Sequence, residues 1–234
     1  MVTIYQYSLN YADLTGRATV NGFPVAVFDT VSSGVFSGPL NHLLLAGDNI
    51  LKVDVSRRGS DAFLKGKVDL VAQGAVVDTR SGGQFSLPEG AAPLAVEHHF
   101  SAEEGPLGRL LGTLKPADMA EVGDYLFEVG RVIRAGDRAA VVSLFRPKFL
   151  YLAEAMGYPP EAIEPELEQL AEAFAGADLS LGGGDLALEA CCDGKLVPLV
   201  RPDGTQLIRV EADGGSMQID AAVGTTPEGP ALVI

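Results

Sequence analysis

The spacing of apolar residues changes once along this chain, and that change limits the fold more than any other feature. From Thr3 to about Phe100, short apolar runs are separated by Gly, Asn, Asp and Ser and show no sustained helical spacing. After about Lys115, apolar residues recur every three to four positions, and alternating runs follow them. The pattern predicts two domains: an all-β antiparallel sandwich over 1–100 and an α+β domain over 116–234, joined by a linker over 101–115.

The N-terminal domain contains one sharply defined turn. Apolar runs at 17–20 and 23–28 flank Asn21-Gly22, the dipeptide that best tolerates the positive φ angles of a two-residue hairpin. Alternation over 49–55 predicts a strand with one buried and one wet face. Seven or eight short strands of this kind predict a sandwich, with a closed barrel as the alternative. The further predicted strands are 62–72, 83–87 and 93–100.

The C-terminal domain begins with helices. Apolar residues at helical spacing predict an amphipathic helix over 117–135, which Gly136 ends in a left-handed conformation. Asp137 is the predicted N-cap of a second helix, and Pro147 predicts a kink or a restart within it. A third helix is predicted over 160–175.

Beyond a glycine-rich segment the period becomes alternating, which predicts a meander of strands. Asp193-Gly194 is the first predicted turn between them. Helices followed by a meander form an α+β domain. The predicted strands are 186–192, 195–200, 206–211 and 217–223, with 231–234 as an edge strand.

Acidity is concentrated in the second half. The chain carries a net charge of −14; residues 1–115 hold 9 Lys and Arg against 11 Asp and Glu, and residues 116–234 hold 8 against 20. No basic residue lies between Lys148 and Lys195, a stretch that contains ten carboxylates. Such a surface repels phosphate backbones and anionic lipid, so nucleic acid and membranes are not expected partners. It is either a solvated helix face or a docking surface for a basic partner.

The cysteines and histidines do not predict a metal site. Neighbouring residues in a strand point to opposite faces, so Cys191 and Cys192 predict a buried strand pair without a disulfide between them. For the same reason His98 and His99 would face opposite sides of a strand and share no ligand. With three histidines in the chain, no zinc motif can be written, and no metal or cofactor is predicted.

Val20-Asn21-Gly22 and, after a spacer, the run from Leu44 to Val53 resemble the jelly-roll, galactose-binding-like sandwich modules that accompany many glycoside hydrolases. The resemblance implies a β-sandwich fold. It also raises carbohydrate binding as a hypothesis, because sugars stack on exposed aromatic rings. The candidate ligand-binding rings are Tyr5, Tyr7, Tyr11 and Phe28.

The run from Tyr125 to Ala135, the Gly136-Asp137 turn and Arg146-Pro147-Lys148-Phe149 resemble the helices and entry segment of the NTF2-like (SnoaL-like) α+β cone. The resemblance implies a pocket that hosts small-molecule isomerases, dehydratases or cyclases, or else serves oligomerisation and binding. Such enzymes pair an Asp with a His or Tyr, and this half has no His. The candidate catalytic residues are therefore Tyr125, Tyr151, Asp185 and Glu189.

The preferred hypothesis is a non-catalytic binding or assembly protein with an acidic interaction surface. The alternative is a small-molecule lyase or isomerase whose active site lies in the C-terminal pocket. The expected partner is a protein or a small molecule, and homo-oligomer formation is left open. The chain has no run of about 18 apolar residues and no secretory signal pattern, so a cytoplasmic location is the default expectation.

Overall fold

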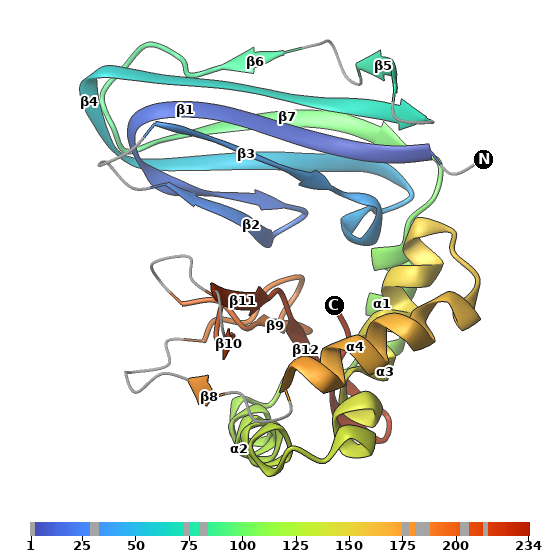
Figure 1. The fold of residues 1–234 in the computed structure, drawn as a ribbon. Helices are drawn as coiled ribbons and strands as arrows, with labels where there is room; N and C mark the ends of the chain where they lie inside the picture. Colours follow the sequence, from blue (N-terminus) through green and yellow to red (C-terminus); the bar gives the residue numbers. More distant parts are fainter. Residues whose placement is uncertain are drawn as a thin grey trace. The chain divides into compact units, whose positions relative to one another are not determined.

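The computed structural model describes residues 3–28, 33–72, 75–79, 84–174, 178–180, 188–201, 206–212 and 215–234. The chain divides into two compact units, Met1–Arg109 and Leu110–Ile234 (Figure 1). The first unit consists mainly of strands and the second contains helices and strands, and each unit is described by itself below.

The N-terminal unit contains one antiparallel sheet of seven strands and a short 3-10 helix, η1, at Asn41–Leu43. Its strands are β1 (Thr3–Val20), β2 (Phe23–Phe28), β3 (Gly34–Pro39), β4 (Gly47–Ala72), β5 (Ala75–Thr79), β6 (Phe85–Ser86) and β7 (Leu94–Ala102).

Two long strands, β1 and β4, run through the whole sheet. They pair antiparallel from Thr3↔Ala72 to Val20↔Leu51. The outer edge of β1 pairs first with β3 and then with β2, and the outer edge of β4 pairs first with β7 and then with β6 and β5. The sequence predicted separate short strands, and this prediction was wrong for these two, because their apolar runs continue across a bend.

The bend lies between the two halves of β1. Asp13 has φ 50°, and the register with β4 shifts on either side of it, between Ala12 and Leu14 and again between Thr15 and Gly16. Such bulges bend a strand and increase its twist. Figure 1 shows β1 and β4 curving together at one end of the sheet.

Side chains from the two halves of the bent sheet meet in its interior. The Tyr11 ring lies 4.8 Å from that of Phe28, and the Tyr7 hydroxyl donates a hydrogen bond to the Val25 carbonyl at 3.0 Å. On the other side, Phe85 stacks on His98 at 4.9 Å. The sheet thus folds back on itself, and its inner face forms the core of the unit.

The predicted hairpin at Asn21-Gly22 is confirmed. Both residues have positive φ, 51° and 85°, and they connect β1 to β2. The Asn21 side chain also donates to Asn49 Oδ1 at 2.7 Å and accepts from the Ile50 amide at 3.0 Å. Asn49 is fully buried and binds the backbone of Leu45 in both directions. The turn residue therefore also positions the loop before β4.

The helices and the remaining strands follow. The helices are α1 (Pro106–Thr113), α2 (Met119–Ala135), α3 (Arg138–Met156), the 3-10 helix η2 (Pro160–Ile163) and α4 (Glu164–Phe174). The strands are β8 (Asp178–Ser180), β9 (Leu196–Pro198), β10 (Ile208–Ala212), β11 (Gly215–Ile219), β12 (Ala222–Thr226) and β13 (Gly229–Leu232). The predicted linker over 101–115 instead contains the end of β7 and helix α1.

The predicted helix ends are confirmed by their capping contacts. Gly136 ends α2 with φ 65°, and Asp137 Oδ1 accepts a hydrogen bond from the Ala139 amide at 3.0 Å at the start of α3. Of the two alternatives predicted at Pro147, a kink or a restart, the restart was wrong, because α3 continues across this residue. The proline removes one backbone hydrogen bond, while the buried face packs on both sides of it.

The predicted single meander is divided between two three-stranded sheets, ordered β11-β10-β8 and β13-β12-β9. The predicted strand over 217–223 is wrong: β11 ends at Ile219, and β12 begins at Ala222 in the other sheet. Residues 188–190 of the predicted strand over 186–192 lie outside strands. Edge strand β13 was predicted, although it begins at Gly229.

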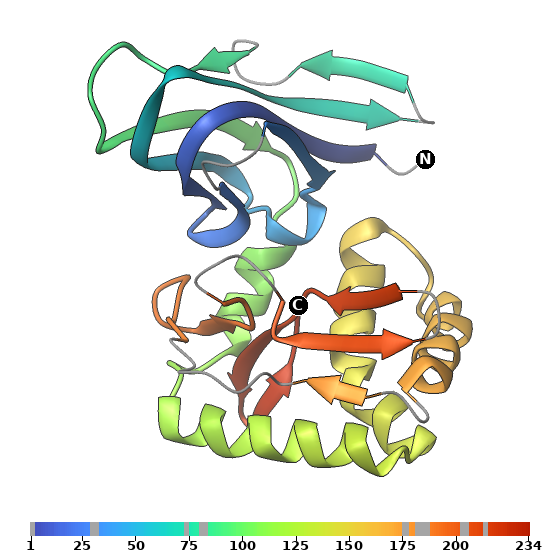
Figure 2. The same cartoon turned by 60° about the vertical axis from the view of Figure 1, so that its left-hand side comes forward.

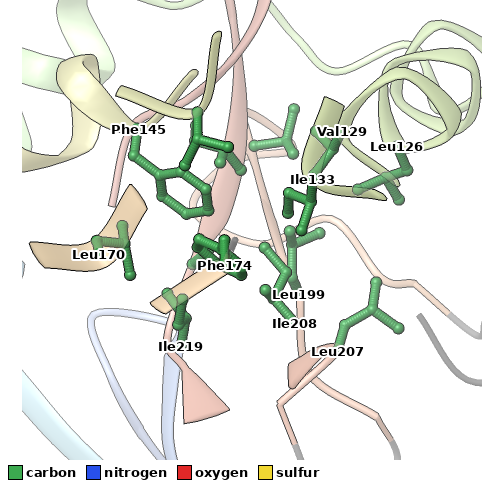
Figure 3. Close-up of a cluster of buried hydrophobic side chains, with 14 of the residues drawn as sticks. Leu126, Val129, Ile133, Phe145, Leu170, Phe174, Leu199, Leu207, Ile208 and Ile219 are labelled. Atoms are coloured by element: carbon green, nitrogen blue, oxygen red, sulfur yellow. The ribbon is translucent and has the colours of Figure 1, made fainter. Parts of the chain in front are cut away.

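The C-terminal unit has an apolar interior. Helices α2 and α3 contact β13, and α4 contacts β10 (Figure 2). The Phe145 and Phe174 rings stack 5.5 Å apart, and apolar side chains from the helices and strands gather around them (Figure 3). Burial of this cluster provides the main driving force for packing the helices onto the strands.

Candidate functional site

All four aromatic candidates of the N-terminal unit are buried. Tyr5, Tyr7 and Tyr11 are at most 8% exposed, and Phe28 is 1% exposed. Carbohydrate binding by stacking required an exposed cluster of these rings. The inward-facing positions of β1 and β2 and the bend of the sheet place them in the core instead, so that hypothesis is removed for these residues.

The catalytic candidates of the C-terminal unit lie in different environments. The hydroxyl of half-buried Tyr125, on α2, accepts a hydrogen bond from the Leu232 amide at 3.2 Å, and burial raises its pKa. Tyr151 is buried on α3, whereas Glu189 is exposed. Asp185 lies outside the described residues. Tyr125 therefore anchors edge strand β13 to α2, which is a structural role.

Lys148 is a buried charged group that sequence reasoning missed. Its side chain lies on the buried face of α3, and the residue is 6% exposed. Burial lowers the pKa of the Lys148 amine to about 8, and the charge of Asp220 acts in the opposite direction. The available signal was helical spacing, because the buried positions Val141, Phe145, Lys148 and Tyr151 follow one another at intervals of three or four.

An acidic face covers η2 and α4. All five of its carboxylates are exposed. Two of them meet arginines of α3: Arg146 binds both oxygens of Glu164, and Arg138 lies 3.5 Å from Glu172. The Arg146 contact lowers the pKa of Glu164. The members of the acidic face are Glu161, Glu164, Glu166, Glu168 and Glu172.

Cys191 and Cys192 lie in a tight turn, not in the predicted strand. Cys191 pairs with Leu196 across the turn, and Cys192 has φ 53°. The Cys191 thiol donates a hydrogen bond to Cys192 Sγ, with the sulfurs 3.5 Å apart. The expectation of opposite-facing side chains was wrong here, because it holds for extended backbone and Cys192 is left-handed.

The predicted opposite orientation of the two histidines is confirmed: His98 is buried, and the side chain of His99 is 63% exposed. Within the described ranges, no group of three or more His, Cys, Asp or Glu side chains is placed to hold a metal ion. Likewise, no described helix is both long and apolar enough to cross a membrane.

Comparison with protein-family models, with curated proteins and with solved structures found no match to this chain. The jelly-roll and NTF2-like resemblances therefore stay predictions.

Proposed function

We propose that this is a non-catalytic binding or assembly protein whose acidic face docks a lysine- and arginine-rich surface of a protein partner. The observation that carries the proposal is the run of five exposed carboxylates along η2 and α4, two of which bind arginines of α3. The face keeps a net charge of about −3 from these seven groups. Its field attracts cationic surfaces and repels phosphate.

Unequal pairing within the face supports docking over a purely structural role. Arg146 and Arg138 occupy Glu164 and Glu172, which ties α3 to α4. Glu161 and Glu166 have no ion pair among the described residues, so they are free to meet a partner's cations. Exposed pairs contribute little stability, whereas complementary charge raises the association rate and selects partners.

The test is binding of a fluorescently labelled oligolysine peptide, followed by anisotropy as salt is raised. The triple variant Glu161→Gln, Glu166→Gln, Glu168→Gln is expected to weaken binding at least tenfold at low salt, because it removes three charges from the face. The wild-type affinity should fall steeply with salt, since the contact is exposed to screening.

The matched control removes three exposed carboxylates from the other unit, through Glu89→Gln, Glu103→Gln and Glu104→Gln. It changes the net charge equally and is expected to leave most of the binding intact. Equal losses in the two triple variants would show a general charge effect, and unchanged binding in the first variant would exclude the face. Either result contradicts the proposal.

A second candidate function, a small-molecule lyase or isomerase, is favoured by one observation. A buried lysine whose pKa is about 8 is partly deprotonated near neutral pH, which suits a general base or an amine nucleophile. Trapping with acetaldehyde and borohydride at pH 8 should label Lys148 faster than exposed Lys115. Labelling of Lys115 alone would exclude Lys148 as an accessible nucleophile.

A further inference from the structure

The turn that carries Cys191 and Cys192 has an unusual backbone. Cys192, Asp193 and Gly194 are left-handed in succession, with φ of 53°, 58° and 76°. Gly adopts this conformation freely and Asp tolerates it, whereas the side chain of a cysteine makes it unfavourable. The Cys191 amide donates to the Leu196 carbonyl at 2.7 Å and closes the turn. The closed turn holds Cys192 in the less favourable conformation.

That conformation brings two reactive groups together. The left-handed twist turns both thiols to the same side, so the sulfurs lie 3.5 Å apart, and both cysteines are partly exposed. A hydrophobic core would bury such residues fully, and an ordinary strand would separate them. Proximity and access to solvent are the two conditions that thiol–disulfide exchange requires.

We propose that Cys191 and Cys192 form a reversible intramolecular disulfide, which makes this turn a redox-modification site for low-molecular-weight disulfides of the glutathione type. The site is separate from the acidic face and does not depend on the proposed docking function.

The hydrogen bond between the thiols assigns their roles. Because Cys191 donates to Cys192 Sγ, it stabilises the Cys192 thiolate and lowers the pKa of Cys192, against the opposing effects of burial and of the Asp193 charge. The same hydrogen bond and burial raise the pKa of Cys191. Redox-sensing cysteines combine a low pKa with access and a neighbouring resolving thiol. Cys192 is therefore the attacking thiol, and Cys191 is the resolving one.

The reaction balances in two exchanges. The Cys192 thiolate attacks one sulfur of glutathione disulfide, the S–S bond breaks, and one glutathione thiolate leaves with a proton from solvent. Cys191 then loses its proton and attacks Cys192 Sγ, which releases the second glutathione. The two protein thiols are oxidised, and one glutathione disulfide is reduced to two glutathione molecules.

The test uses the full chain, reduced and then equilibrated in glutathione buffers of increasing oxidised fraction. After alkylation, mass spectrometry is expected to show a monomer that has lost two hydrogens and carries no alkyl group on either cysteine. Reduction should restore both alkylation sites. Alkylation of both cysteines at every ratio, or only stable glutathione adducts or chain dimers, would overturn the proposal.

Two single variants test the roles. Cys191→Ser is expected to accumulate a glutathione adduct at Cys192, because no resolving thiol is present. Cys192→Ser is expected to react several-fold more slowly with glutathione disulfide, because the remaining thiol has the raised pKa. Equal rates would overturn the assignment of Cys192 as the attacking thiol.

A measurement on the wild type alone keeps the proposal falsifiable should either variant fold poorly. Phenylarsine oxide condenses with two neighbouring thiols and releases one water, without any oxidation. One arsenical per chain is expected to bind and to block both alkylation sites. Failure to bind would show that the two sulfurs do not act as a pair, which contradicts the geometry on which the proposal depends.

Discussion

One buried polar residue in each unit shows the difference between a fully hydrogen-bonded group and a buried charge. In the N-terminal sheet, Asn49 is completely buried, and its amide side chain makes four hydrogen bonds that join a turn, a loop and a strand. In the C-terminal unit, Lys148 is 6% exposed and makes no hydrogen bond within the described residues. A fully hydrogen-bonded buried group favours one arrangement of its surroundings, whereas a buried charge costs stability because it loses hydration. The side chains with potential reactivity, those of Lys148 and the two cysteines, lie in the C-terminal unit.

The largest expected effect concerns the bend that gives the N-terminal unit its core. A Cβ on Gly16 would lie 2.1 Å from the Asp54 carbonyl oxygen, so Gly16→Ala should destabilise this unit by about 4 kcal/mol. Urea unfolding followed by hydrogen exchange localises the loss. Gly123→Ala on α2 is the control, because its Cβ meets nothing within 4 Å. That control should stabilise the C-terminal unit by about 0.5–1 kcal/mol. A mild effect at Gly16 would contradict a tight crossing of β1 and β4.

The next largest effect is expected from removing the hydrogen bonds of the buried Asn49 side chain. Asn49→Ala removes four hydrogen bonds and leaves the Asn21 side chain without one of its partners, which should cost about 3 kcal/mol. Exposed Asn10, on β1, offers a matched Asn10→Ala control with an expected change within about 0.5 kcal/mol. Similar unfolding free energies for the two variants would remove the contrast between the units.

A substitution at Lys148 is expected to increase the unfolding free energy instead of lowering it. Lys148→Met nearly keeps the length of the side chain and removes the buried charge. It should therefore stabilise the C-terminal unit by about 2–3 kcal/mol at pH 7. The folded pKa is about 8 against 10.5 for the ordinary amine, so the unfolded wild type binds more protons between these values. The unfolding free energy of the wild type should therefore rise with pH between these two pKa values. Above them, the variant should no longer be more stable than the wild type.

The control for this pH profile is Lys115→Met at an exposed position. It is expected to leave both the unfolding free energy at pH 7 and its rise with pH nearly unchanged. A destabilising effect of Lys148→Met at every pH would mean that the amine stabilises the fold, and the comparison between the units would fail.

The smallest effect concerns Tyr125. Tyr125→Phe removes the hydroxyl that accepts from the Leu232 amide and should cost about 1 kcal/mol. Hydrogen exchange in β13 should accelerate at the same time. Tyr158→Phe, at a residue that is 55% exposed, is the control and should change neither quantity. Unchanged hydrogen exchange in β13 would show that the Tyr125 hydroxyl does not anchor this strand, and Tyr125 would again be a catalytic candidate.

Local signals in the sequence were reliable where neighbouring residues decide the conformation. Asn21-Gly22 forms the predicted hairpin, and Gly136 and Asp137 separate two helices as expected. These features depend on φ preference and on hydrogen bonds within three residues. The positions of apolar residues in α3 also indicated that Lys148 lies on the buried face of this helix, although its burial was not among the predictions from the sequence.

Longer-range features did not follow from the sequence. The burial of Tyr5, Tyr7 and Tyr11 depends on the second half of the sheet covering the first. The separation of β11 from β12 depends on which strand each one pairs with, and alternation is the same in either sheet.

The sequence by itself determined the two-part organisation, the turns, the helix caps and the concentration of acidic charge, because each depends on composition or on residues close in the chain. Only the tertiary structure decided which aromatic rings are buried and that two adjacent thiols face the same side. Those outcomes depend on backbone bends and on contacts between distant segments, which hydrophobic burial and chain closure select together.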